Sequence, residues 1–265
     1  QRGRTVLVLD SSNKVGKKIL MSGGGRCNFT NLEIEPENYI SANTHFVKSA
    51  LNSYTQWDFI ALAEKHGIAY HEKTLGQLFC DESSKQILEM LLSECREAGV
   101  KIQTHCQIQS VEKNGDRFAL ETSLGNFTCN SLVVATGGLS IPTMGSSGFG
   151  YELAEQFGLE VLDRSAALVP FTFSDHFKVV CERLAGLSVD VVMSAGGQSF
   201  REGLLFTHRG LSGPVSLQVS SYWSPGDSIA IDLIPDHDAS DYLLNAKTSQ
   251  GKSLVRSVLS KMLPK

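Results

Sequence analysis

The sequence lacks the features that mark membrane, metal-binding and disulfide-rich proteins. Among its 265 residues, no apolar run approaches the roughly 18 that a membrane-spanning helix needs. Its six cysteines form no C-x-x-C pair, and no two histidines have the i, i+4 spacing of a helical metal site. The first residues also lack the apolar stretch and cleavage site of a signal peptide. These absences favour a reduced, cytoplasmic protein with single thiols and no bound metal.

An excess of basic residues is missing as well. The formal net charge is −4, so the field of the whole chain gives no support to nucleic acid as a partner. With 42% hydrophobic residues the chain can bury a sizeable core, and its length is close to that at which chains divide into two domains. We therefore expect an ordinary globular protein without a membrane partner, and its oligomeric state is left open.

What is present begins with a run of three glycines. Residues 22–31 read Ser-Gly-Gly-Gly-Arg-Cys-Asn-Phe-Thr-Asn. Without Cβ atoms, this backbone can take positive φ and approach a ligand closely, and its successive N–H groups can form an anion-binding nest. Arg26 adds donors suited to phosphate, and Asn28 adds an amide. Three lysines lie just upstream, at Lys14, Lys17 and Lys18. The alternative interpretation is a flexible turn with an isolated arginine.

An apolar run precedes this motif and ends in a carboxylate. Residues 5–10 (Thr-Val-Leu-Val-Leu-Asp) are typical of a parallel strand buried on both faces. Dinucleotide folds place a ribose-binding acid at such a strand end, although Asp10 could equally be a helix N-cap or a turn residue. In those folds the acid follows a first strand, a glycine-rich turn and a helix. Only nine residues precede Asp10, so we expect the first βα unit to be absent, with Arg2-Gly3-Arg4 as the end of its helix.

The order of the remaining elements predicts an α/β fold. Helices are expected within 44–67, at 85–98 with Ser84 as N-cap, and at 151–157. Strands are expected at 100–104, 107–112 and 117–122, with a type I′ hairpin at Asn114-Gly115, a continuation at Phe127 and a core strand at 132–135. The sequence thus predicts a doubly wound nucleotide-binding layer with a three-stranded β-meander.

The pattern changes near residue 165. Strands are expected at 168–173, 187–193, 198–201, 204–206 and 228–233, with a hairpin at Gly196-Gly197. Residues 238–265 read as helical, with Pro264 at the end. We therefore predict two domains, residues 1–165 and residues 166–265.

Three segments carry a resemblance to a known family. Residues 14–31, 135–145 (Ala-Thr-Gly-Gly-Leu-Ser-Ile-Pro-Thr-Met-Gly) and 205–214 (Leu-Phe-Thr-His-Arg-Gly-Leu-Ser-Gly-Pro) resemble the signatures of bacterial BaiN/YhiN-type, or aminoacetone-oxidase-like, NAD(P)/FAD-dependent oxidoreductases. The resemblance implies an FAD-binding domain of the two-dinucleotide-binding type, interrupted by an inserted β-rich and helical substrate domain. It also implies that the chain is an interior portion of a protein of roughly 400 residues, without the C-terminal segment that closes over the flavin.

The resemblance assigns roles to particular residues. Asp10 would bind the ADP ribose, the backbone at Ile108 would meet the adenine, and residues 207–213 would approach the flavin ring. The full set of candidate cofactor-binding residues is Asp10, Lys17, Lys18, Ser22, Gly23, Gly24, Gly25, Arg26, Cys27, Asn28, Ile108, Ala135, Thr136 and Gly137.

The implied chemistry is hydride transfer by flavin, with NAD(P)H as co-substrate and a small organic molecule as substrate. Reduction of an activated C=C or C=O bond and oxidation of an amine are both compatible. His208 is the candidate general acid and Arg209 the candidate anchor for an anionic group, while the alternative is that both merely cap a turn. Cys27 is either a redox thiol or a packed small side chain. Two alternative functions stay open: a non-catalytic nucleotide-binding or interaction module, and a nicotinamide-only dehydrogenase.

Overall fold

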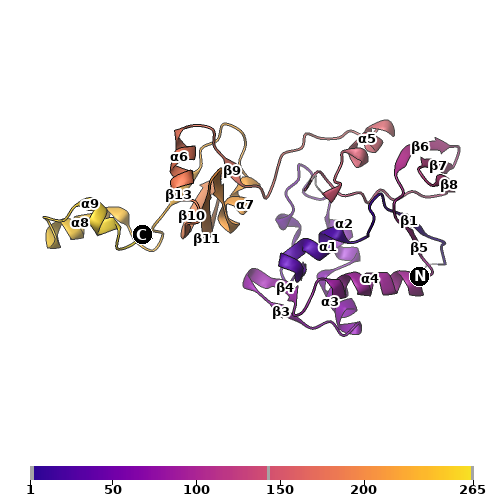
Figure 1. Ribbon diagram of the computed structural model, residues 1–265, viewed down its shortest axis with the longest axis horizontal. Helices are drawn as coiled ribbons and strands as arrows, with labels where there is room; N and C mark the ends of the chain where they lie inside the picture. Colours follow the sequence, from indigo (N-terminus) through magenta and orange to yellow (C-terminus); the bar gives the residue numbers. More distant parts are fainter. Residues whose placement is uncertain (1–2, 142–143, 264–265) are drawn as a thin grey trace. The chain divides into compact units, whose positions relative to one another are not determined.

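The chain folds as two units, Gln1–Leu162 (unit 1) and Asp163–Lys265 (unit 2). The computed structural model describes residues 3–141 and 144–263 (Figure 1). The sequence interpretation also used residues that lie outside the described ones: Arg2, Pro142, Thr143 and Pro264. The assignment of unit 2 as an inserted substrate domain stays a prediction.

Unit 1 begins with a parallel pair of short strands. Strand β1 (Leu7–Leu9) pairs in parallel with β5 (Lys101–Gln103), as expected for an α/β layer. The prediction that this apolar run is buried on both faces is wrong, because Val6 is 44% and Val8 38% exposed. Within the described residues no third strand pairs with β1 or β5, so this sheet has only two strands and offers little surface on which other elements could pack. The predicted core strand at 132–135 is also not formed, because these residues pair with no strand in the described part of the chain. Val133 is 83% exposed.

A second layer of unit 1 consists of a small sheet covered by helices. The sheet is antiparallel in the order β2 (Asn28–Asn31), β4 (Gln77–Cys80), β3 (Tyr70–Glu72). The covering helices are α1 (Lys17–Met21), α3 (Gln56–Lys65) and α4 (Lys85–Glu97), while α2 (Lys48–Ser53) precedes α3 and buries none of its residues. The core between these elements is built from Cys27, Ala63, Ile68, Cys80, Ile87 and Met90.

The predicted β-meander is present. Its strands are β6 (Ile108–Asn114), β7 (Arg117–Thr122) and β8 (Gly125–Cys129), followed by α5 (Phe149–Gln156). Because Asn114 pairs with Arg117, the turn consists of Gly115-Asp116 rather than Asn114-Gly115. Gly115 has φ of 64° and Asp116 has no positive φ, which places glycine at the first central position, as in a type II′ turn.

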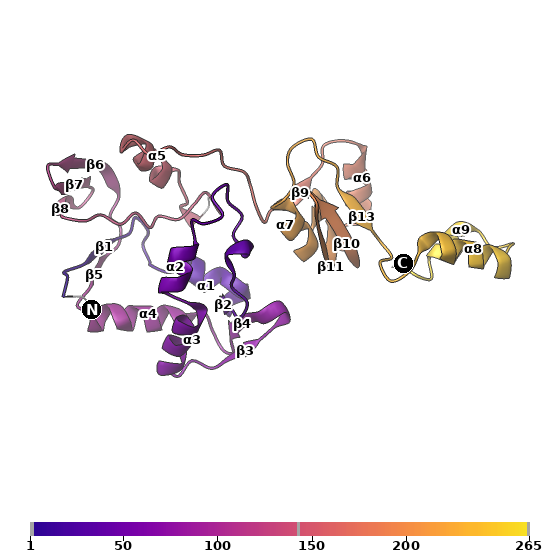
Figure 2. The same ribbon diagram turned by 180° about the vertical axis from the view of Figure 1, so that it is seen from behind.

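Unit 2 is organised around one antiparallel sheet. Its order is β13 (Ala230–Asp232), β10 (Ser188–Ala195), β11 (Gln198–Thr207), β12 (Gly210–Ser212), β9 (Phe171–Thr172). Its helices are α6 (His176–Arg183), α7 (Pro214–Ser220), α8 (Ala239–Ser249) and α9 (Val255–Leu259). Both views show α7 beside β10 and β11, and Val215 and Val219 of this helix are fully buried in the core (Figures 1 and 2). The sequence interpretation missed α6 and α7. Across the described residues, no helix is both long and apolar enough to cross a membrane.

The hairpin between β10 and β11 is the one that its two glycines predict. Ala195 pairs with Gln198, and Gly196 and Gly197 have φ of 56° and 77°. A Cβ built on Gly196 would collide with the carbonyl oxygen of Tyr222, whereas one built on Gly197 would meet no atom within 4 Å. Gly196 therefore serves both the turn and its packing, while Gly197 serves the turn alone.

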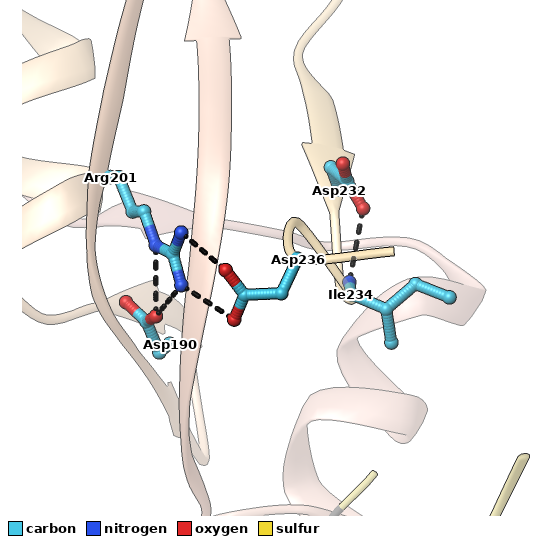
Figure 3. A network of polar contacts seen from close by, with 5 residues as sticks. All are labelled: Asp190, Arg201, Asp232, Ile234 and Asp236. Carbon is cyan, nitrogen blue, oxygen red and sulfur yellow. Dashed lines mark hydrogen bonds and ion pairs between the residues drawn. The ribbon is translucent and has the colours of Figure 1, made fainter. Parts of the chain in front are cut away.

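An ion-pair network joins the two long strands to the segment after β13 (Figure 3). Arg201 on β11 donates to Asp190 on β10 at 2.9–3.0 Å and to both carboxylate oxygens of Asp236 at 2.8 Å. Hydrogen bonds to Asp236 and Asp190 raise the pKa of Arg201, and the bond from Arg201 lowers the pKa of Asp236. All three side chains are largely exposed, so we expect a modest, pH-dependent stabilisation.

The two glycines of the β10–β11 turn provide a matched test of packing. Gly196→Ala should destabilise the protein by about 3 kcal/mol, because the left-handed backbone and the collision with Tyr222 both carry a cost. Gly197→Ala should lower the unfolding free energy by only about 1–2 kcal/mol, the cost of the left-handed backbone alone. Urea denaturation measures both, and equal losses would contradict the role of the Tyr222 contact.

The Arg201 network predicts a dependence of stability on pH. A carboxyl whose pKa is lowered in the folded state contributes stability above its unfolded pKa, about 3.9, and loses it as pH falls through the folded value. The difference in melting temperature between the native chain and Asp236→Asn should therefore be present at neutral pH and shrink in acid. Asp232→Asn is the control, because Asp232 accepts from the backbone N–H of Ile234 and does not contact Arg201. A difference that grows in acid would contradict the network's contribution.

Candidate functional site

The triglycine stretch forms a tight turn at the end of α1. It is a 3₁₀ turn over Ser22–Gly25, in which Gly23, Gly24 and Gly25 have φ of 57°, 65° and 90°. Three consecutive left-handed residues are the conformation that the absence of Cβ atoms allows. A Cβ built on Gly24 or Gly25 would meet no atom within 4 Å, so this part of the turn faces open space.

The turn is held in place from beneath by strand β4 and the start of α4. A Cβ built on Gly23 would lie 2.6 Å from Cε1 of Phe79, so the glycine lies directly against this ring. The backbone N–H of Ser84 donates to the carbonyl of Gly25 at 2.8 Å, and that of Cys80 donates to Arg26 at 3.0 Å. Because these partners lie in the core of unit 1, the turn is a fixed element and not a flexible loop.

Ser84 has a different role from the predicted one. It lies at the N-cap position of α4, but its φ and ψ of −56° and −18° are helical and its side chain makes no capping bond. Instead its hydroxyl, in a residue only 2% exposed, donates to the carbonyl of Leu20 at 3.1 Å. Ser84 therefore fixes the end of α1 and the glycine turn together. Sequence reasoning missed this function, and it missed Phe79 as the support of Gly23.

The thiol of Cys27 is packed and not presented to solvent. Cys27 is 5% exposed, has φ of 54° and lies in one core cluster with Cys80. Burial, with Cys27 nearby, raises the pKa of the Cys80 thiol to about 11, so this thiol stays protonated at neutral pH. The structure supports the packed alternative for Cys27, and all six cysteines are unpaired.

Cationic side chains flank the turn on its exposed side. Arg26 is exposed and, within the described part of the chain, has no hydrogen bond or ion pair from its side chain. Lys18 donates to the hydroxyl of Ser140 at 2.7 Å, and its Nζ lies 3.9 Å from a Cβ built on Gly137. Lys17, the first residue of α1, is half-buried. The structure thus brings Lys18 and Gly137, two predicted site residues far apart in sequence, close together.

Asp10 lies at the carboxyl end of β1 and begins a turn. Its Oδ1 accepts from the backbone N–H of Ser12 at 2.8 Å, while its own N–H donates to Gln103 at 2.9 Å. The turn role that the sequence left open is therefore real. It uses one carboxylate oxygen, and Oδ2 has no hydrogen bond from the residues that the structure describes.

The other predicted cofactor residues lie in three places. Ile108 begins β6 and packs in the same cluster as Leu9 of β1. Ala135, Thr136 and Gly137 are exposed and outside any strand, and Thr136 Oγ1 lies 3.0 Å from a Cβ built on Gly150, near the start of α5. The side-chain amide of Asn28 lies 3.2 Å from the carbonyl of Leu78 and 3.0 Å from that of Thr30. Because carbonyls only accept hydrogen bonds, the amide nitrogen of Asn28 faces them.

The region fits a large polar ligand with phosphate groups. The hydroxyls of Ser22, in the glycine turn, and Ser12, two residues after Asp10, are buried and have no partner among the described residues. Buried hydroxyls without partners are costly, so a ligand that bonds to them gains affinity. An open glycine turn, an unpaired arginine and a carboxylate at a strand end are groups of the kinds that bind dinucleotides. No group of three or more potential metal ligands lies together in the described residues.

In unit 2, His208 and Arg209 lie at the tip of the β11–β12 hairpin. The hydroxyl of Thr207 accepts from the backbone N–H groups of Arg209 and Gly210 at 3.3 and 3.2 Å and donates to the Gly210 carbonyl. The turn is therefore capped by Thr207. Both His208 and Arg209 are exposed, and neither side chain has a hydrogen bond or ion pair from the described residues.

Residues 1–215 match the family model described as the HI0933-like protein Rossmann domain. The chain is 52% identical to the ribosomal RNA dihydrouridine synthase of Escherichia coli, over 100% of this chain and 66% of that protein. It is 50% identical to the protein of the same name from Haemophilus influenzae, over 99% of this chain and 67% of that protein. The chain thus spans about two thirds of the length of these relatives.

Two more distant similarities are weaker. The 3-dehydro-bile acid delta(4,6)-reductase of Clostridium scindens is 26% identical, over 89% of this chain and 59% of that protein. Among solved structures, NikD, an unusual amino acid oxidase of nikkomycin biosynthesis, is 12% identical over 72% of this chain and 52% of its own, with a TM-score of 0.33 that establishes no close structural match. The family model covers most of the chain, and the chain therefore belongs to the HI0933-like family of FAD-binding Rossmann proteins.

Proposed function

We propose that unit 1 holds FAD at the triglycine turn and that the protein is a flavin-dependent reductase of uridine in ribosomal RNA. The observation that carries the cofactor site is the turn itself, with three left-handed glycines, two of them facing open space. The substrate follows from the two relatives that are 52% and 50% identical and are named for dihydrouridine synthesis in ribosomal RNA.

Each of these candidate groups has a defined part in the proposed binding of FAD. The backbone of Gly24 and Gly25, with the Arg26 guanidinium, meets the pyrophosphate. The free oxygen of Asp10 accepts from a ribose hydroxyl, as the acid at this strand end does in dinucleotide folds. The buried hydroxyls of Ser12 and Ser22 form hydrogen bonds with polar atoms of the ligand, and these bonds offset the free-energy cost of burying the hydroxyls. When bound, the flavin supplies the hydride chemistry, and NAD(P)H is the proposed electron donor.

The substrate-side roles belong to unit 2 in this proposal. Dihydrouridine differs from uridine by the addition of a hydride and a proton across one C=C bond, so the reaction needs a proton donor. His208 is exposed, unpaired among the described residues, and carries an imidazole, the side chain most often used for proton transfer. Arg209, the next residue, is the proposed anchor for an anionic group of the substrate.

Flavin binding can be tested with two glycines of unit 1 that share the same backbone strain. Gly24 and Gly67 have φ of 65° and 68°, and a Cβ on either would meet no atom within 4 Å. Valine at either position should destabilise the fold similarly, by about 1–2 kcal/mol. Only Gly24→Val should weaken FAD binding, by about tenfold or more, because only its side chain enters the proposed site. Flavin absorbance after gel filtration and an FAD titration measure this. Equal retention of FAD by both variants would contradict the placement.

The substrate can be tested with the flavin-loaded protein, NAD(P)H and ribosomal RNA that lacks the modification. We expect a uridine in the RNA to gain two hydrogens, detected by mass spectrometry of nuclease fragments, with oxidation of the nicotinamide. His208→Gln should slow this step and change its pH profile while leaving FAD binding intact. Turnover of small enones or amines, without any change in RNA, would instead support the small-molecule substrate that the sequence predicted.

A further inference from the structure

Unit 2 contains a cleft lined mainly by aromatic and aliphatic side chains. It has a volume of about 330 Å³ and lies between β9, the start of α6, and the segment from Trp223 to β13. Its apolar lining includes Phe171, Phe173, Phe177, Leu211, Trp223 and Ile231. The volume is at the small end of the roughly 300–1,000 Å³ range of ligand pockets, so it suits a single small ring system.

The aromatic side chains of this cleft are held in fixed orientations. Phe171 and Trp223 meet edge to face with ring centroids 5.5 Å apart, and Phe173 and Phe177 do the same at 4.9 Å. The Trp223 indole N–H donates to the carbonyl of Asp227 at 2.8 Å, which fixes the ring and satisfies its only donor. A preformed aromatic wall binds planar rings at a low entropic cost.

The exposed cationic turn lies next to this wall. The backbone N–H of Phe173 donates to the carbonyl of Arg209 at 3.1 Å, and Thr172 pairs with Gly210. The hairpin tip with Arg209 is thus bonded directly to the strand that forms one side of the cleft. Thr172 and Asp227 are exposed and add polar groups at its rim.

We propose that this cleft binds one unstacked base of single-stranded RNA, with Arg209 on an adjoining phosphate. A nucleotide joins a flat aromatic ring, polar ring edges and an anion within a few ångströms, which is the combination that the cleft, its rim and the neighbouring turn offer. Proteins bind splayed-out RNA bases by stacking them on aromatic side chains beside cations. The inference rests on the proposed RNA substrate and adds where unit 2 contacts it.

Tryptophan fluorescence tests the site directly, without flavin or turnover. Trp57 and Trp223 are the only tryptophans, so in the Trp57→Phe background the signal comes from the cleft alone. A short oligouridylate should quench it, whereas an abasic oligonucleotide of the same length and inorganic phosphate should not. Phe177→Leu, which keeps apolar volume but removes a ring, should weaken oligouridylate binding about tenfold. Arg209→Gln should weaken it and lower the slope of log K against log salt by about one.

Phe200→Ala is the matched control within unit 2. Phe200 packs against Tyr222, with ring centroids 5.7 Å apart, and does not line the cleft, so its loss should leave oligouridylate affinity unchanged. Thermal melting of each variant separates loss of binding from loss of fold. Quenching that is equal for the abasic strand, or that survives Phe177→Leu in a folded protein, would overturn the inference, as would binding of aliphatic carboxylates in place of RNA.

The inference and the proposed function can fail separately. If the protein forms dihydrouridine but oligouridylate leaves Trp223 fluorescence unchanged, the cleft is not the RNA site although the function stands. If the base binds the cleft but flavin-loaded protein leaves ribosomal RNA unchanged, the binding site stands and the proposed reaction is wrong.

Discussion

The contact between Gly23 and the ring of Phe79 is the constraint on which the glycine turn depends. A Cβ built here would lie 2.6 Å from Cε1 of Phe79 and 2.8 Å from the backbone nitrogen of Asn28, so any side chain would force the ring or the backbone to move. Once the backbone is this close, the carbonyls of Gly25 and Arg26 reach the N–H groups of Ser84 and Cys80. The first glycine therefore serves packing, and Gly24 and Gly25 are left free to meet a ligand. One run of identical residues thus has two different physical roles.

Close backbone approaches also shape the proposed substrate side. A side chain on Gly210 would collide with the carbonyl of Phe171, and one on Gly213 would lie 2.5 Å from the carbonyl of Gly203. These two glycines let the short strand β12 pair with both β9 and β11. That pairing brings the turn with His208 and Arg209 beside the aromatic cleft. In both units, the absence of Cβ atoms determines where exposed functional groups are presented.

Local patterns predicted the features that depend on local physics. The Gly196-Gly197 turn, the β-meander and the positive φ of the triglycine stretch follow from residues adjacent in the chain. Features that depend on distant partners could not be read in this way. Ser84 reads as an N-cap, but its hydroxyl bonds to Leu20, 64 residues away. Residues 132–135 read as a strand, but a strand needs a neighbour to pair with, and within the described residues they have none.

The net charge of −4 gives no support to RNA as a partner, but a whole-chain sum is a poor guide to local binding. It counts each cation equally, although acidic neighbours already neutralise some of them. Arg201 donates to both Asp190 and Asp236, and Lys65 to Glu94, so these cations offer little to an anionic ligand. Arg26 and Arg209 have no such partner among the described residues. Because exposed charges are screened beyond about 10 Å at 0.1 M salt, a phosphate group responds to these unpaired arginines far more than to the total. An acidic protein can therefore bind an anionic cofactor and an anionic substrate through a few unneutralised cations.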